Sequence, residues 1–185
     1  MNSAVHPDPI PVATGQLKLR PAAPSDFDLL NHWHRQPQVV AANGDDWGRE
    51  AELAGKPDWR TPLIAEADGR PVGVIQIIDP TRGESHNWGC AKEGQRAIDI
   101  RIGNAVELDQ AYGAEIMKLA IKLCFADPSV TAVLVDPPVN DPRAQRFYER
   151  FGFEYVARRR FGEDDSFVYR LKRPVEVPAT APNTA

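Results

Sequence analysis

The spacing of apolar and polar residues predicts a strand and an amphipathic helix near the start of the chain. Leu17–Arg20 alternates apolar and basic side chains, as a half-buried strand does. Ser25 suits a helix N-cap, with Asp28 three positions later, and the following apolar positions are Phe27, Leu29, Leu30 and Trp33. From Gln36 to Trp59 glycines and a proline break the pattern, so we expect short helical pieces and loop over a substrate site.

A β-hairpin is expected next. Pro62–Ala67 and Arg70–Asp79 are two strand-like segments joined by Asp68 and Gly69, a pair that tolerates the positive φ of a tight turn. The polar, glycine-containing segment Thr81–Gln95 follows and is a second candidate wall of a substrate site.

The middle of the chain predicts a strand and then a helix. Ala97–Ile102 is a short apolar strand with one acidic residue, and Gly113–Phe125 carries apolar residues every three or four positions. The pair Asp127 and Pro128 stops this helix. Val130–Val135 is almost entirely apolar, as a strand buried on both faces is.

The last part of the chain predicts a helix and an antiparallel hairpin. The helix runs from about Pro142 to Gly152, which serves as its C′ glycine. The hairpin has the strands Phe153–Arg160 and Phe167–Lys172 around a turn at Gly162–Asp165. Strands, crossover helices and a closing hairpin make a mixed α/β sheet.

Composition limits the class of protein. The 185 residues, 42% of them hydrophobic, suit one domain over residues 15–173, with solvated, disordered tails at 1–14 and 174–185. The N-terminal segment has neither a basic start nor an apolar run, so we expect no signal peptide and no membrane span. The two cysteines, Cys90 and Cys124, are too few for a disulfide framework, which favours a reduced, cytoplasmic protein.

Charge and motif content narrow the function. A net charge of −4 without a long basic run argues against a nucleic-acid partner and leaves room for a cationic ligand. The four histidines have no metal-ligand spacing, so we expect no metal site. The chain also lacks a Gly-x-Ser-x-Gly elbow and a Walker turn.

One turn is suited to an anionic ligand. Leu108–Gly113 lies between a strand and a helix, where unpaired N–H groups and the positive end of the helix dipole can receive a pyrophosphate. Its small residues, Ala111 and Gly113, permit close approach. The alternative is that they only let the helix pack closely.

The stretch from Ala97 to Phe153 resembles the GNAT family of N-acetyltransferases, and within it the aminoglycoside 6′-N-acetyltransferases. The resemblance is carried by Ala97-Ile98-Asp99, Gly103-Asn104-Ala105, Leu123 to Thr131, Asp136-Pro137, Arg143-Ala144 and Tyr148-Glu149. The segments Gly69–Gln76 and Asp164–Tyr169 also look similar, whereas Gln36–Trp59 and Thr81–Lys92 do not. The resemblance implies the GNAT fold: a mixed, mostly antiparallel central sheet with splayed central parallel strands, flanked by helices.

The resemblance also implies a coenzyme A site for the cosubstrate acetyl-CoA. The family's Arg/Gln-x-x-Gly-x-Gly/Ala turn is matched in degenerate form, with Leu108 first, Ala111 fourth and Gly113 sixth. Asp141 stands where the family often has an asparagine that contacts pantetheine. The residues expected to hold the coenzyme are Arg101, Ile102, Gly103, Leu108, Asp109, Gln110, Ala111, Tyr112, Gly113, Ala114 and Asp141.

Two residues are implied as catalytic. Asp99 matches the acid that aligns the substrate amine and accepts its proton; the alternative is that it caps a loop or pairs with Arg96 or Arg101. Tyr148 matches the tyrosine that protonates the departing thiolate, although it shares an apolar face with Phe147 and neighbouring residues and can be core.

The resemblance points to a polycationic small-molecule amine as substrate. Asp136 is expected to face the substrate amines where the central strands splay, unless it only serves the turn with Pro137. Carboxylates on several walls suit such a ligand, because each exposed ion pair is worth little in water. The further substrate-binding candidates are Asp46, Trp47, Trp88 and Asp164, with Asp45, Glu84, Glu163 and Asp165 as additional acids.

The expected function is therefore acetylation of the 6′-amine of an aminoglycoside by direct transfer in a ternary complex, by a monomer or homodimer. Within the enzyme class, acylation of a siderophore precursor or of a protein N-terminus stays open. A non-catalytic acyl-CoA-binding sensor is the alternative from another class.

Overall fold

The computed structural model describes residues 16–35, 58–82, 91–102, 110–161 and 164–174. Most of the predicted loops Gln36–Trp59 and Thr81–Gln95, and both predicted tails apart from Pro174, lie outside these residues. Among the described helices, none is long and apolar enough to cross a bilayer.

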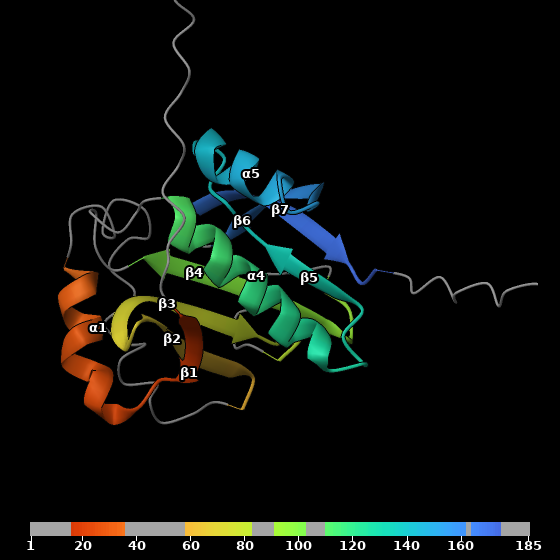
Figure 1. Cartoon of the computed structure of the whole chain (residues 1–185). Coiled ribbons are helices and arrows are strands. Elements are labelled where there is room, and N and C mark those ends of the chain that lie inside the picture. The colour runs from red at the N-terminus through yellow and green to blue at the C-terminus, as the bar shows by residue number, and fades with distance from the viewer. Residues whose placement is uncertain (1–15, 36–57, 83–90, 103–109, 162–163, 175–185) are drawn as a thin grey trace, which may run out of the picture.

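Seven strands form one mixed sheet with the order β1-β2-β3-β4-β5-β7-β6 (Figure 1). All neighbouring strands are antiparallel except β4 and β5, which are parallel. The strands are β1 (Leu17–Pro21), β2 (Arg60–Ala67), β3 (Arg70–Ile78), β4 (Gln95–Ile102), β5 (Ala132–Val135), β6 (Glu154–Phe161) and β7 (Asp164–Lys172). The sequence-based prediction of a mixed, mostly antiparallel α/β sheet is confirmed.

The entry into the first helix differs from the prediction. A 3₁₀ turn at Pro24–Asp26 precedes α1 (Phe27–His34), so Ser25 lies inside the turn and is not the N-cap. The ring of Pro24 presets the backbone for a helical turn one residue earlier. The carboxylate of Asp26 accepts the backbone N–H of Ala23 at 2.8 Å, which closes this turn.

The hairpin between β2 and β3 has the predicted turn. Asp68 and Gly69 have φ values of 51° and 79°, and Ala67 pairs with Arg70 directly across the turn. Both turn residues therefore adopt the left-handed region that a two-residue hairpin loop requires.

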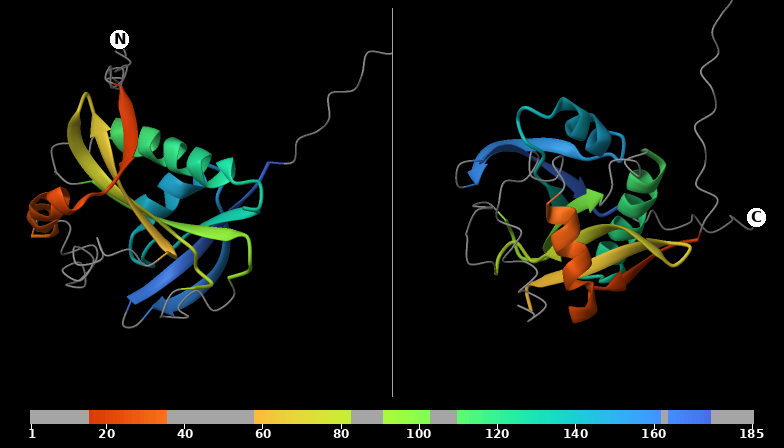
Figure 2. Two further views of the ribbon diagram at one scale, coloured as in Figure 1. Left: turned by 90° about the horizontal axis from the view of Figure 1, so that it is seen from below. Right: turned by 90° about the vertical axis from the view of Figure 1, so that its left-hand side faces the viewer.

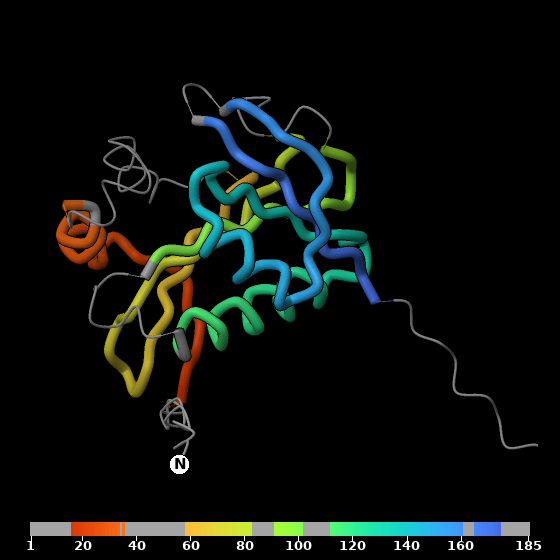
Figure 3. The backbone as a smooth tube through the Cα atoms, turned by 90° about the horizontal axis from the view of Figure 1, so that it is seen from above, coloured from red at the N-terminus to blue at the C-terminus, as the bar shows by residue number. Residues whose placement is uncertain are grey.

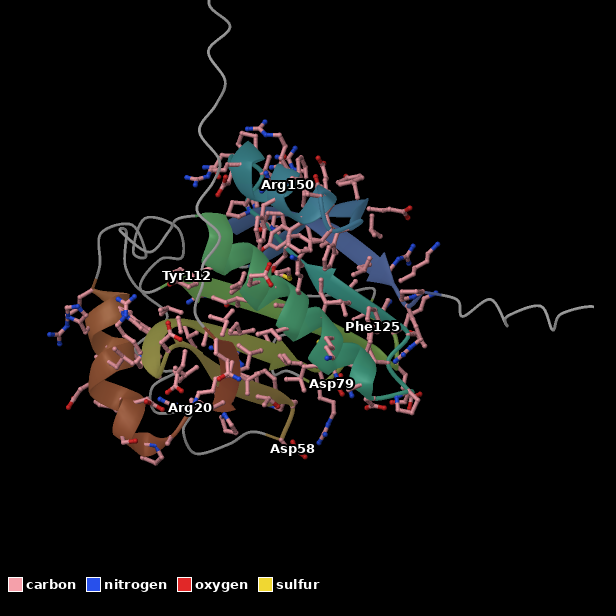
Figure 4. All side chains as sticks on the ribbon, viewed as in Figure 1. Arg20, Asp58, Asp79, Tyr112, Phe125 and Arg150 are labelled. Atoms are coloured by element: carbon pink, nitrogen blue, oxygen red, sulfur yellow. The ribbon has the colours of Figure 1, made fainter. Side chains whose placement is uncertain are left out.

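Helix α4 (Gln110–Ala126) begins three residues before the predicted start at Gly113. The sequence-based prediction placed Gly113 at the boundary, as the last residue of the Leu108–Gly113 turn and the first of the helix. In the structure Gly113 is buried within the helix, and Asp127 and Pro128 follow its end as predicted. Figure 4 shows Tyr112 and Phe125 at opposite ends of α4.

Helices α1 and α4 cover opposite faces of β2 and β3 (Figure 2, left). On one face Trp33 of α1 packs with Ile64 and Val74. On the other, the main core contains residues of β3, β4, β5 and α4, among them Ile75, Ile98, Ile116, Met117, Val133 and Cys124. Burial raises the pKa of the Cys124 thiol to about 12, so Cys124 acts as a small apolar side chain, as expected.

The C-terminal part closes the sheet. Helix α5 (Pro142–Glu149) is followed by Gly152 at φ 84°, and the N–H groups of Gly152 and Phe153 bond back to Glu149 and Tyr148. This is the predicted C′ glycine in a Schellman motif. The β6–β7 strands extend to Phe161 and Asp164, beyond the predicted turn boundaries, and Figure 3 shows this hairpin on a different side of the molecule from α1.

Candidate functional site

Strand β4 presents two kinds of side chain to the two faces of the sheet. Ile98 and Ile100 belong to the core under α4. Asp99 and Arg101 alternate with them along β4. In the register between β3 and β4, Asp99 lies opposite Gln76 and Arg101 lies opposite Val74. Because Val74 packs with Trp33, the acidic and basic side chains of β4 lie on the α1 face of the sheet.

Asp99 and Arg101 form an ion pair on this face. Nη2 of Arg101 lies 2.7 Å from Oδ2 of Asp99, and the two side chains are only 15% and 31% exposed. One of the alternatives considered for Asp99, pairing with a neighbouring arginine, is therefore present with Arg101. Arg96 instead lies 3.9 Å and 3.7 Å from Asp79 and Asp127.

The parallel pairing of β4 with β5 ends early. Gln95, Arg96 and Ala97 pair with β5, whereas β4 continues through Ile102 without a β5 partner among the described residues. Backbone groups of β4 on that side are therefore available to another partner. This is the separation of central parallel strands that the prediction included.

Asp136 follows β5 at the point where the pairing ends, and its side chain is partly buried. Two backbone hydrogen bonds to β7 hold the chain after it: Phe167 N–H donates to Pro137 O, and Val139 N–H donates to Asp165 O. Because these bonds to β7 hold the turn after Asp136, the Asp136 side chain is not needed to hold it. Its position in the turn is therefore compatible with a side chain that faces a ligand.

Tyr148 of α5 is partly buried against the main core. Its ring makes edge contacts with Phe147 and Phe153, at centroid distances of 5.4 Å and 5.9 Å. Tyr148 is therefore a packing residue, as the alternative interpretation held, whatever its hydroxyl contacts.

Burial raises the pKa of the Tyr148 phenol well above its usual value, and the negative charges of Asp99, Asp136 and Asp141 raise it further. The positive charge of Arg101 acts in the opposite direction. The fold therefore brings five predicted site residues into one electrostatic neighbourhood, although they come from β4, α5 and the segments that follow β5 and precede α5.

Asp141 stabilises the start of helix α5. Its Oδ1 accepts the backbone N–H groups of Arg143 and Ala144 at 3.1 Å and 3.0 Å, so Asp141 is the N-cap of α5. A cap of this kind also contributes negative charge at the positive end of the helix.

The first turn of α4 contains Gln110, Ala111, Tyr112 and Gly113. The N–H groups of the first three, Gln110, Ala111 and Tyr112, have no acceptor within the helix. The described part of the predicted anion-binding segment is thus the first helical turn, and Ala114 lies in the position after Gly113. N–H donors at a positive helix end fit a pyrophosphate group.

Several predicted residues cannot be placed. Asp46, Trp47, Trp88, Gly103, Leu108 and Asp109 lie outside the described residues. The backbones of Ile102 and Asp164 are placed, at the end of β4 and the start of β7. Within the described residues, no group of three or more potential metal ligands is present.

One residue of the site was missed by the sequence-based prediction. Gln76 is 3% exposed and pairs directly with Asp99 across β3 and β4. A polar residue within the otherwise apolar Val72–Ile78 segment was the available signal, but its neighbour depends on the register between strands.

The sequence matches the acetyltransferase (GNAT) domain family over residues 22–161. The chain belongs to this family. The GNAT chain is 35% identical over 151 residues to aminoglycoside N(6′)-acetyltransferase type 1 of Klebsiella pneumoniae, covering 74% of this chain and 73% of that protein. It is also 22% identical over 182 residues to the lysine N-acyltransferase MbtK of Mycobacterium tuberculosis, covering 94% of this chain and 83% of that protein.

Solved structures agree with the family assignment. The crystal structure of AAC(6′)-Ib in complex with coenzyme A and kanamycin matches the GNAT chain with a TM-score of 0.77 and 25% identity, covering 85% of this chain and 95% of that one. The predicted GNAT fold is confirmed, and the chain is an acetyltransferase-type domain.

Proposed function

We propose that this protein transfers an acetyl group from acetyl-CoA to the 6′-amine of an aminoglycoside, directly and within a ternary complex. The observation that carries the proposal is the 35% identity to an aminoglycoside N(6′)-acetyltransferase over most of both chains. The charges of Asp99 and Asp136 both act on Tyr148, and Asp99 lies in the part of β4 that does not pair with β5, which supports the proposal.

Acetyl-CoA supplies an activated thioester: the amine nitrogen bonds to the acetyl carbon, the carbon–sulfur bond breaks, the amine loses a proton and the sulfur gains one. The first turn of α4 offers N–H donors for the pyrophosphate. Arg101, Ile102 and Gly103 are proposed to line the strand edge for the pantetheine arm. Backbone N–H groups near Ile102 are proposed to polarise the thioester carbonyl.

Asp99 and Asp136 are proposed to bind the acceptor amine and to remove its proton, with Asp99 as the acceptor of that proton. Two carboxylates near one position favour a cationic ligand. Holding the nitrogen close to the thioester converts a bimolecular reaction into one within a complex, which supplies much of the rate.

Tyr148 is proposed to give a proton to the sulfur. Its raised pKa keeps the phenol protonated throughout the physiological range. Positive charge that develops on the attacking nitrogen reduces the effect of the carboxylates on the phenol, so Tyr148 becomes a stronger acid as the amine attacks.

The outer part of the acceptor is proposed to contact Asp46, Trp47, Trp88 and Asp164, as sugar-stacking and charged walls. Asp141 is proposed to contact the pantetheine arm in addition to capping α5. We further propose a cytoplasmic protein, monomeric or homodimeric, that acts on small polycations rather than nucleic acid and confers antibiotic resistance.

A second candidate is acylation of a lysine-type amine. It is supported by the similarity to MbtK, named a lysine N-acyltransferase, which extends over 94% of this chain. In that case the acceptor would carry fewer amines and an additional polar or anionic group.

The test is thiol release from acetyl-CoA with purified protein and a panel of acceptors: kanamycin, an analogue lacking the 6′-amine, L-lysine and an N-terminal peptide. Turnover with kanamycin and not with its analogue supports the proposal. Activity with lysine alone would overturn the aminoglycoside assignment and favour the second candidate. Binding of acetyl-CoA without any turnover would favour the sensor.

A further inference from the structure

The ion pair between Arg101 and Asp99 sets an unusual charge balance at the reacting centre. A site for polycationic amines is expected to be acidic, yet a guanidinium occupies one oxygen of the nearest carboxylate at 2.7 Å. Both side chains are largely buried, so their charges are screened less than those of an exposed pair.

An amine that reaches the other oxygen of Asp99 comes within about 5 Å of the Arg101 guanidinium, given ordinary hydrogen-bond lengths. At such a distance two like charges repel strongly in a partly buried site. A nearby cation disfavours the ammonium form of an amine and favours the neutral form. Only the neutral amine has the lone pair that attacks a thioester.

We propose that Arg101 promotes the release of a proton by the acceptor amine on binding, at the expense of weaker attraction for the cation. The inference rests on the proposed N-acetyltransferase function, and it concerns the acceptor side of the site. The ammonium proton passes to solvent on binding, the neutral amine stays hydrogen-bonded to Asp99, and the second proton, lost when the nitrogen bonds to the acetyl carbon, goes to Asp99.

Other charged and titratable groups face the same place. Asp136 follows β5, Asp141 caps α5, and Tyr148 belongs to α5. The charges of Asp99, Asp136, Asp141 and Arg101 all act on the pKa of the Tyr148 phenol. From β3 the facing residue is the uncharged Gln76. Among these groups Arg101 supplies the positive charge that opposes the three carboxylates.

The test compares wild type with Arg101→Gln and Arg101→Lys in the protein saturated with coenzyme A. Calorimetry of kanamycin binding at pH 7 in two buffers of different ionisation enthalpy counts the protons released. We expect Arg101→Gln to release fewer protons and to bind kanamycin severalfold more tightly. Arg101→Lys, which keeps the positive charge, should restore most of the proton release.

Turnover gives an independent reading. In Arg101→Gln the acid limb of the kcat–pH profile should move up by about one pH unit, and kcat on that limb should fall about tenfold while KM falls. The matched control is Arg96→Gln, an arginine of the same strand that lies near Asp79 and Asp127, and it should leave the limb in place.

Unchanged proton release and an unmoved acid limb in a folded Arg101→Gln protein would overturn the proposal. If that variant does not bind coenzyme A, Arg101→Met replaces it, because methionine keeps the apolar stem without the charge. Where kanamycin is not acetylated but L-lysine is, the aminoglycoside proposal fails and the same series is read with lysine. Silence with both acceptors in the wild type overturns both proposals.

Discussion

The carboxylate of Asp99 lies close enough to Tyr148 to affect the pKa of its phenol. Burial raises this pKa most, and the negative charge of Asp99 raises it further. The two residues belong to α5 and β4, elements that are not neighbours along the chain. Their proximity depends on β5, which carries the chain across from α4, and on the bonds from Pro137 and Val139 to β7 that return it toward α5.

Tyr148→Phe should reduce kcat by about 100-fold with little change in the KM of either substrate, because the lost hydroxyl acts on the departing sulfur. Binding of coenzyme A, measured by calorimetry, should stay within a few-fold of wild type. Tyr155→Phe, at an exposed tyrosine of β6, is the matched control and should retain full activity. Equal kcat values in wild type and Tyr148→Phe would assign Tyr148 to packing alone.

Asp99→Asn and Asp136→Asn should separate proton removal from amine binding. If Asp99 accepts the proton, its replacement lowers kcat by about 100-fold across the pH range. Asp136→Asn should instead mainly raise the acceptor KM, since it removes one attractive charge. The reverse pattern, measured by steady-state kinetics from pH 5 to about pH 9, would make Asp136 the base.

Gly94→Ala should destabilise the protein much more than Gly69→Ala. Both glycines have positive φ, 77° and 79°, but a Cβ at Gly94 would lie 2.7 Å from Ser129 O, whereas a Cβ at Gly69 meets nothing within 4 Å. We expect losses of about 3 and about 1 kcal/mol in the free energy of unfolding, measured with urea.

The larger loss has a specific structural reason. Gly94 O accepts both the backbone N–H and the hydroxyl of Thr131, at 2.7 Å and 3.2 Å, and so joins the start of β4 to the start of β5. Similar losses in the two alanine variants would show that this junction yields at little cost.

Asp26 should make stability depend on pH. Its hydrogen-bonded pairing with Arg20 is the largest cause that lowers the carboxyl pKa in the folded state, and the Ala23 N–H lowers it further while burial acts in the opposite direction. A lowered folded-state pKa means that the stabilisation is present above the unfolded value of about 3.9 and is lost as the pH falls through the folded value.

Asp26→Asn should therefore cost about 3 kcal/mol at pH 7, because it leaves the Arg20 guanidinium with one anionic partner fewer in a partly buried place. The difference from wild type should shrink below about pH 4 in urea titrations. A difference that is constant with pH would mean that packing, not charge, accounts for the loss.

Local sequence signals were sufficient where one residue type answers one backbone requirement. The Asp68–Gly69 turn and the C′ glycine at Gly152 both need positive φ or tolerate it, and both were predicted correctly. The helix boundaries predicted at Ser25 and Gly113 were wrong. Ser25 suits an N-cap, but Pro24 starts the helical turn one residue earlier. Gly113 suits a helix end, but it lies on a buried face inside α4.

The contents of the site divide in the same way. Asp99 and Tyr148 were predicted as site residues from residue type and family resemblance. Two features were not predicted: Gln76 lies beside Asp99, and Asp99 pairs with Arg101 rather than with Arg96. Both depend on strand register and on the direction of side chains, which are set by contacts between segments far apart in sequence.

By itself, the sequence of this protein determined the kind and order of most of its described elements, since apolar periodicity and turn residues act over a few positions. It also carried the family resemblance from which a coenzyme turn and a role for the acid of β4 were predicted. Only the tertiary structure decided that β4 and β5 part after Ala97 and Leu134, that the charges of Asp99 and Asp136 both act on Tyr148, and that Arg101 pairs with Asp99. The reason is physical. Apolar periodicity determines which face of a helix or strand is buried, but the packing of distant segments determines which charged groups come together where water is largely excluded.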